Sequence, residues 1–157
     1  MSARWQEFAT QAPDMAERVK ARFSWTKHHV IATLRKNGAP RVSGTEVEFH
    51  GPDLTIGLMW GSVKARDLQR DGRYALHSNP GDSSMQGGDA KISGVAQEVV
   101  DQDELQAFVL DTGAPQPFHL FRLTISEAVL TSVDPSGEFL LIESWRPGQP
   151  VVRIERR

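Results

Sequence analysis

The sequence predicts a mainly β protein, a small antiparallel β-barrel with peripheral helices. Short apolar segments, several with alternating polar positions, recur along the chain and are separated by turns rich in Gly, Pro, Asn and Asp. Apolar residues at helical spacing occur only near the N-terminus and in two short later segments. Since no linker or repeat divides the chain, residues 1–157 are interpreted as one domain.

Three helical regions are expected. Apolar residues from Trp5 to Val19 recur at three- and four-residue steps, and Pro13 divides them into two helices, the second running to about Phe23. Residues 1–24 are thus an N-terminal helical segment that packs on the barrel. Residues 62–70 and 101–111 form two further helices, because Ser62 and Asp101 are typical N-cap residues.

Seven strands are expected, mostly antiparallel because their connections are short. Asn37-Gly38 favours the positive φ angles of a tight hairpin turn after the first strand. Residues 78–89 contain three Gly, three Ser and a Pro, which is typical of a loop. The expected strands cover residues 29–34, 41–49, 54–59, 74–77, 91–100, 119–133 and 138–145.

The composition excludes several functional classes. Eighteen basic and twenty acidic residues give a net charge of −2, whereas a nucleic-acid-binding protein usually carries an excess of positive charge. The chain has no cysteine, which excludes disulfides, thiolate metal sites and a cysteine nucleophile. No apolar run is long enough for a signal peptide or a membrane span, so we expect a cytoplasmic protein without a membrane partner.

The segment Phe139–Ile142 is apolar at four consecutive positions, so both faces of its strand should be covered. One face would fill the barrel. The other needs either a second subunit or a terminal helix.

The segment Trp60–Leu68 carries the clearest chemical signal. It follows a strand and begins a helix, whose N-terminus offers unpaired N–H groups and partial positive charge. With the Ser62 hydroxyl, the Lys64 ammonium and nearby Arg66, it could bind a phosphate. The alternative is an ordinary N-cap followed by a solvated basic helix face.

About three quarters of the chain resembles the pyridoxamine 5'-phosphate oxidase-like flavin- and deazaflavin-binding split-barrel family. The order and spacing of the matching segments carry the resemblance, and residues 88–96 and 145–148 also resemble the small actinobacterial-type branch. The segments are residues 32–43, 54–57, 61–68, 70–77 and 88–96, with Trp145-Arg146-Pro147-Gly148 near the end.

The resemblance implies an FMN-binding split barrel that forms a homodimer, with the cofactor in a groove between subunits. Its phosphate would bind Ser62 and Lys64 with support from Arg66, and Trp145 and Arg146 would approach from the partner. The ring would lie along two strands, near Arg41, Val42, Ser43, Leu58, Met59 and Trp60, with His77 and Asn79, at the end of a neighbouring strand, within reach.

The chain departs from oxidases that act on pyridoxamine phosphate. Val42 stands where they carry a phosphate-binding arginine, and Arg41, one step away, points to the other face of the strand. Their basic residue before the phosphate lysine is Val63 here, and their closing Arg-Leu-Ala-Pro segment is absent. We therefore expect an oxidoreductase that uses FMN or an 8-hydroxy-5-deazaflavin coenzyme on another small molecule, with catalytic residues unknown.

The alternative is a non-catalytic carrier of the cofactor or of haem, with His77 or His119 as the iron ligand. The five histidines show no metal-binding spacing, so no other metal site is expected. Glu46 and Glu48 share a strand face that is either solvated or lines a groove.

Overall fold

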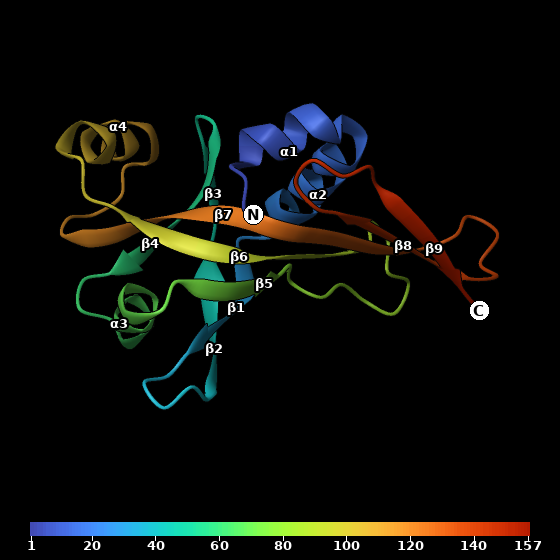
Figure 1. Ribbon diagram of the computed structural model, residues 1–157, viewed down its shortest axis with the longest axis horizontal. Helices are drawn as coiled ribbons and strands as arrows, with labels where there is room; N and C mark the ends of the chain where they lie inside the picture. Colours follow the sequence, from blue (N-terminus) through green and yellow to red (C-terminus); the bar gives the residue numbers. More distant parts are fainter.

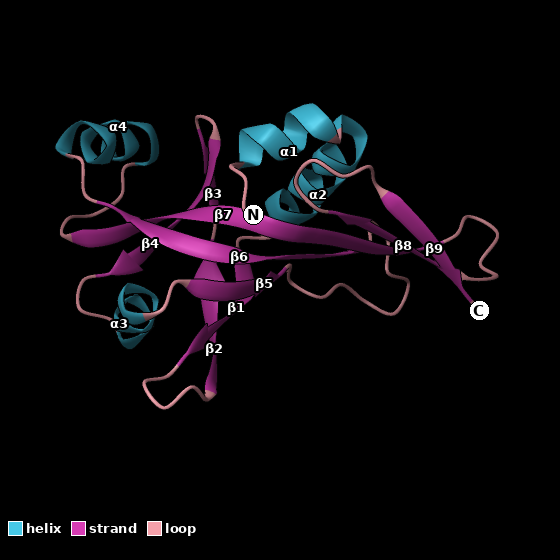
Figure 2. Ribbon diagram, viewed as in Figure 1, coloured by secondary structure: helices cyan, strands magenta, loops and turns pink.

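In the computed structural model, which describes residues 1–157, four helices surround a nine-stranded antiparallel sheet (Figures 1 and 2). This confirms the predicted fold class. The elements in chain order are α1 (Trp5–Gln11), α2 (Pro13–Trp25), β1 (His28–Leu34), β2 (Pro40–Glu46), β3 (Glu48–His50), β4 (Asp53–Met59), α3 (Val63–Arg70), β5 (Arg73–His77), β6 (Asp89–Val99), α4 (Gln102–Thr112), β7 (Phe118–Val133), β8 (Leu140–Trp145) and β9 (Val152–Arg156).

The strands pair in the order β2-β1-β5-β6-β7-β4-β3, while β8 pairs with β7 and β9 pairs with β8. β2 and β4 come into contact without forming a ladder of hydrogen bonds. The sheet therefore curls into a barrel with an open seam between β2 and β4. Helix α3 directly follows β4, which places its first turn beside this seam.

Two strand predictions differ from the structure. The expected strand 41–49 is divided at Val47, because β2 pairs with β1 whereas β3 pairs with β4 on the other side of the seam. The C-terminal strand β9 was not predicted. It is exposed along its whole length, so no burial pattern marks it beyond the alternation of Val152 and Ile154 with charged residues.

The longest ladder joins β6 and β7, and a bulge at Ser93/Gly94 interrupts its register. A Cβ atom on Gly94 would lie 1.9 Å from the carbonyl oxygen of Thr124, so only glycine fits here. Beyond the bulge β7 continues out of the barrel and pairs with β8, forming with β9 the arm at the right of Figure 1.

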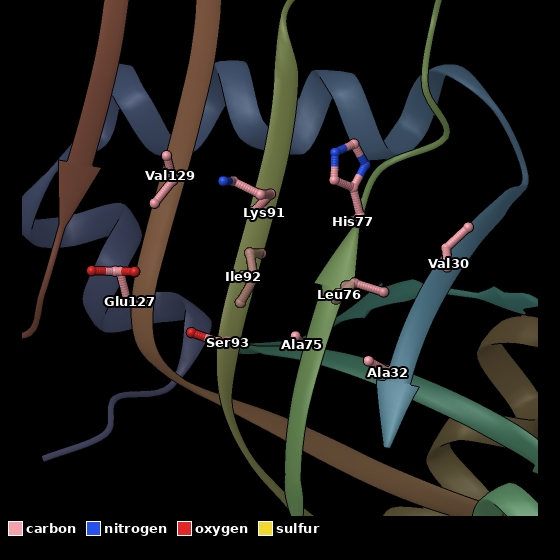
Figure 3. Close-up of a pocket in the computed structure, with 10 residues that line it drawn as sticks. All are labelled: Val30, Ala32, Ala75, Leu76, His77, Lys91, Ile92, Ser93, Glu127 and Val129. Atoms are coloured by element: carbon pink, nitrogen blue, oxygen red, sulfur yellow. The ribbon is translucent and has the colours of Figure 1, made fainter. Parts of the chain in front are cut away.

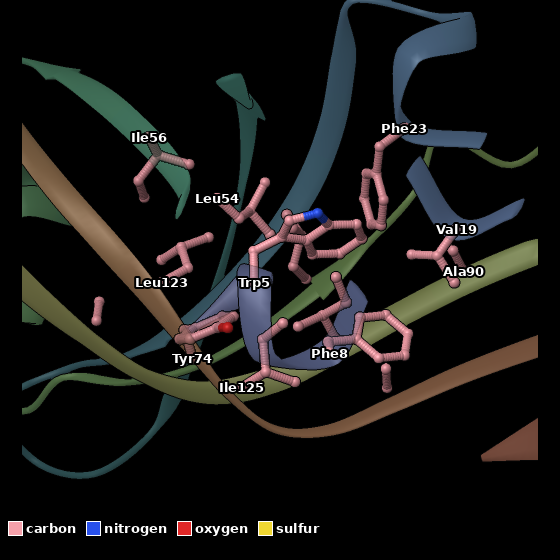
Figure 4. Packing of buried hydrophobic residues seen from close by; sticks show 14 of the residues in the cluster. Trp5, Phe8, Val19, Phe23, Leu54, Ile56, Tyr74, Ala90, Leu123 and Ile125 are labelled. Atoms are coloured by element: carbon pink, nitrogen blue, oxygen red, sulfur yellow. The ribbon is translucent and has the colours of Figure 1, made fainter. Parts of the chain in front are cut away.

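The core lies between the inner face of the sheet and the two N-terminal helices (Figure 4). Helices α1 and α2 bury an apolar stripe that includes Phe8, Val19 and Phe23, as their spacing predicted. The strands contribute alternate residues such as Ile56 and Ile125. No helix is both long and apolar enough to cross a membrane.

Candidate binding site at the barrel seam

Helix α3 begins as the sequence predicted. The hydroxyl oxygen of Ser62 accepts a hydrogen bond from the Ala65 N–H at 3.2 Å, which makes Ser62 the N-cap. Gly61 precedes it with a φ of +74°, a left-handed conformation that favours glycine. The turn between β4 and α3 is thereby fixed, and the first N–H groups of the helix are presented at the seam.

Lys64 crosses the seam from α3 to β2. Its ammonium donates a hydrogen bond to the carbonyl oxygen of Gly44 at 2.6 Å. No carboxylate lies within ion-pair distance of this half-buried cation, and burial lowers the pKa of Lys64. An anion at this corner would restore the solvation that the ammonium loses by burial.

Arg41 forms an ion pair within the protein. Its guanidinium donates to the carboxylate of Asp67 at 2.7 Å, and Asp67 also accepts from Thr33 and Arg70. Burial by itself raises the pKa of Asp67, but the hydrogen bonds from Arg41 and Thr33 outweigh it and lower the pKa. Arg41 therefore neutralises a buried carboxylate that joins α3 to the barrel.

The other residues of β2 and α3 lie where strand and helix periodicity place them. Val42 is 71% exposed on the outer face, opposite to Arg41, as the alternation predicted. Ser43 is half-buried, opposite Ile31 of β1. Arg66 is exposed and bonded only to Gln69, so its charge remains available near the seam.

A groove of about 640 Å³ follows the outer side of the seam, between β4, the ends of β2 and β3, and the loop after α4. Met59 and Trp60 are exposed along it, whereas Leu58 also lines it but is largely buried. Glu46 and Glu48 line the same groove and are also exposed to solvent, so both alternatives describe these glutamates. Ser62, Lys64 and Arg66 are not among the lining residues of this groove.

Sequence reasoning missed the partner of Trp60. The indole stacks on His119 with ring centroids 4.3 Å apart, and His119 is buried. Its Nε2 accepts from the Gly61 N–H, so Nδ1 carries the proton and donates to Glu98 at 2.9 Å. Because these residues are far apart in sequence, no local pattern could reveal the cluster, which supports the turn before α3.

His77 lines a second pocket, about 330 Å³, on the outer face of the sheet formed by β1, β5, β6 and β7. In Figure 3 its ring projects into this pocket beside Val30 and Lys91. Its Nδ1 contacts the Ser78 carbonyl oxygen, and Nε2 has no hydrogen-bond partner. Asn79 turns away from this pocket. Its hydrogen bonds to residues of β1 and α2 hold the loop after β5 in place.

The two residues expected to approach from a partner subunit behave differently. Trp145 is 1% exposed and stacks on Phe8 at 4.7 Å, so it belongs to the core and we exclude it from the cofactor site. The neighbouring Arg146 points to solvent and pairs with Glu127 at 2.9 Å. Glu127 lines the sheet-face pocket, which leaves Arg146 at the edge of that face.

Many solved structures have a similar fold. A pyridoxamine 5'-phosphate oxidase-related, FMN-binding protein from Nostoc punctiforme superposes with a TM-score of 0.64 at 12% identity, covering 93% of this chain and 96% of that one. The chain has a split-barrel fold.

Two further split barrels differ in what they bind. PhzG from Burkholderia lata, solved with tetrahydrophenazine-1-carboxylic acid, has a TM-score of 0.62 at 15% identity, covering 92% of this chain and 89% of that one. A heme-binding protein from Mycobacterium smegmatis has a TM-score of 0.57 at 14% identity and 88% coverage of this chain, which spans only 57% of that protein's length. No protein-family model and no curated protein matches the sequence.

Proposed function

We propose that this split barrel binds FMN, or an 8-hydroxy-5-deazaflavin coenzyme, with the phosphate at the start of α3, and that it works as an oxidoreductase. One observation carries the proposal: the half-buried ammonium of Lys64 has a backbone carbonyl but no carboxylate as partner. Similarity in fold to an FMN-binding protein supports it.

Each residue of the seam has a separate task in this proposal. Lys64 and the first N–H groups of α3 hold the phosphate, while the exposed Arg66 adds charge. Met59 and Trp60 shield the ring edge from water along the groove. The bound cofactor itself supplies the hydride chemistry, so the protein needs no nucleophile of its own.

We also propose that two copies pair through the outer face of the sheet, where the second subunit completes the cofactor groove. Several apolar side chains of this face are partly or largely exposed, and they lie in register across neighbouring strands. They are Val30, Ala32, Val42, Ala75, Val129, Ile142, Val152 and Ile154.

The phosphate assignment is tested by titrating the protein with FMN and with riboflavin, which lacks the phosphate, and following the quenching of flavin fluorescence. Lys64→Gln should weaken FMN binding by roughly tenfold or more and leave riboflavin binding unchanged. Lys36→Gln, in the exposed hairpin turn, is the matched control.

The same titration with the deazaflavin coenzyme shows which cofactor binds more tightly. Failure of both to bind below about a millimolar dissociation constant would refute the proposal. If a cofactor binds, transfer of hydride from its reduced form to a panel of electrophilic acceptors separates an enzyme from a carrier.

A haem-binding carrier is the second candidate, and the free Nε2 of His77 in the sheet-face pocket favours it. His119 does not qualify, because both of its ring nitrogens are already engaged. In that case haem should give a Soret band that is lost in His77→Ala and unaffected by Lys64→Gln.

A further inference from the structure

A second groove, of about 1050 Å³, lies away from the seam. It is bounded by the end of α2, the loop after β5 and the end of β7 with the turn that follows. No residue of it belongs to the proposed cofactor site. The lining residues that matter here are Arg22, Trp25, Met85, Leu130, Ser132 and Val133.

Arg22 lies in this groove as a buried cation without an acidic partner. It is 4% exposed, yet no carboxylate lies within ion-pair distance of its guanidinium. Two of its N–H groups donate to the carbonyl oxygens of Asn79 and Gln86, and its Nε–H has no partner. A buried charge and an unsatisfied donor are both unfavourable unless a ligand completes them.

The loop is shaped around this guanidinium. A Cβ on Gly81 would lie 2.7 Å from a terminal nitrogen of Arg22, and one on Gly87 would touch both Arg22 and Trp25. Met85, a non-glycine residue, adopts a φ of +54° at the same place. Glycines and one left-handed non-glycine residue thus let the loop close tightly around the buried guanidinium.

The surrounding charges indicate what the groove accepts. Arg18 also lines it, but its guanidinium is held by Glu143 and Asp14. The carboxylate of Asp82 is close enough for Arg22 to lower its pKa but is turned towards Ser84, whose hydrogen bonds lower it more. Asp134 also lines the groove, but its carboxylate accepts hydrogen bonds from Ser136 and makes no ion pair with Arg22. Arg22 is therefore the cation of the groove without an acidic partner, and with a carboxylate nearby it favours a monoanion over a phosphate dianion.

The remaining surface of the groove combines aromatic, apolar and hydroxyl groups. Trp25 is 60% exposed and lies 4.6 Å from the Arg22 guanidinium, which covers one part of its ring. Met85, Leu130 and Val133 add apolar surface, and Ser132 adds a hydroxyl. Such a lining fits a flat apolar body that carries one charged group.

We propose that this groove binds a small organic carboxylate, with Arg22 bonded to the carboxyl group and Trp25 against a planar apolar body. The proposal is independent of the flavin site, because the two share no residue. The bound carboxylate would give the buried guanidinium a counter-charge.

The test uses 1-naphthoate and its neutral analogue 1-naphthamide, titrated calorimetrically into the full-length protein. The acid should bind roughly tenfold or more tightly than the amide, because only the acid makes charge-assisted hydrogen bonds to Arg22. Arg22→Gln should abolish this preference. The exposed Arg35→Gln serves as control and should preserve it.

Two further variants keep the test decisive if Arg22→Gln does not fold. Trp25→Ala, at an exposed position, should weaken both ligands by roughly fivefold to tenfold. Lys64→Gln should change neither. Equal affinity of the wild-type protein for acid and amide, no binding below about a millimolar, or loss of naphthoate binding in Lys64→Gln would each overturn the proposal.

Discussion

Asp67 shows how one residue joins the helix beside the candidate site to the barrel. Its carboxylate is 1% exposed and accepts hydrogen bonds from side chains of β1, β2 and α3. The local sequence reveals only a helix with basic residues. The pairing of Arg41 with Asp67 depends on β2 lying beside α3, which no local pattern specifies.

Replacing Asp67 by Asn should lower the free energy of unfolding by about 3 kcal/mol, because the substitution leaves the guanidinium of Arg41 without its counter-charge. Chemical denaturation measures the loss. Asp71→Asn, which removes an exposed ion pair with Arg73, should change stability little. A loss for Asp67→Asn no larger than that of the control would contradict this role.

His29 should make stability depend on pH near neutrality. Burial lowers its pKa below the ordinary 6.5, and its ring nitrogens contact the Phe23 carbonyl oxygen and the Asn79 N–H. Between the lowered pKa and 6.5 the unfolded chain binds more protons than the folded one. The free energy of unfolding should therefore fall as the pH is lowered through this window.

Urea unfolding between about pH 7.5 and about pH 5.5 checks the effect of His29. His29→Gln should reduce the slope of stability against pH. His28→Gln, at the exposed neighbouring position, should retain the wild-type slope. An unchanged slope in His29→Gln would show that other groups cause it.

At the scale of the element, the bulge between β6 and β7 redirects the chain from the barrel into the arm. Gly94→Ala should lower the free energy of unfolding by about 2 kcal/mol or more, because the added methyl group collides with backbone that cannot move freely. Gly57→Ala is a matched control, since its Cβ would make an ordinary 3.8 Å contact with Phe108. Equal stability of the two variants would refute the steric argument.

The helix predictions held because each rests on local chemistry. Pro13 begins α2, and Ser62 is the N-cap of α3. Asp101 is the N-cap of α4, and its carboxylate accepts a hydrogen bond from the Glu104 N–H. Strand partners are not local. The division of residues 41–49 into β2 and β3, and the exposed β9, depend on which neighbouring strands are available after folding.

At the scale of the whole molecule, a charged substitution on the exposed sheet face would test the proposed dimer. Val129→Arg places a charge in the centre of this face and should convert a dimer to a monomer, because a buried unpaired charge costs several kcal/mol. Light scattering after size-exclusion chromatography measures the mass. Leu110→Arg, on the exposed side of α4, should leave the dimer intact. A wild-type protein that is monomeric would end the dimer proposal.

The sequence by itself determined the fold class, the helices and the corner at Ser62 and Lys64, because turn residues, helix caps and alternation act over a few positions. Only the tertiary structure determined the contacts and burial of the other side chains. Arg41 neutralises Asp67, Trp145 packs in the core, and Arg22 is buried without a counter-charge. The physical reason is that charge compensation and burial depend on neighbours brought together only when distant strands and helices pack.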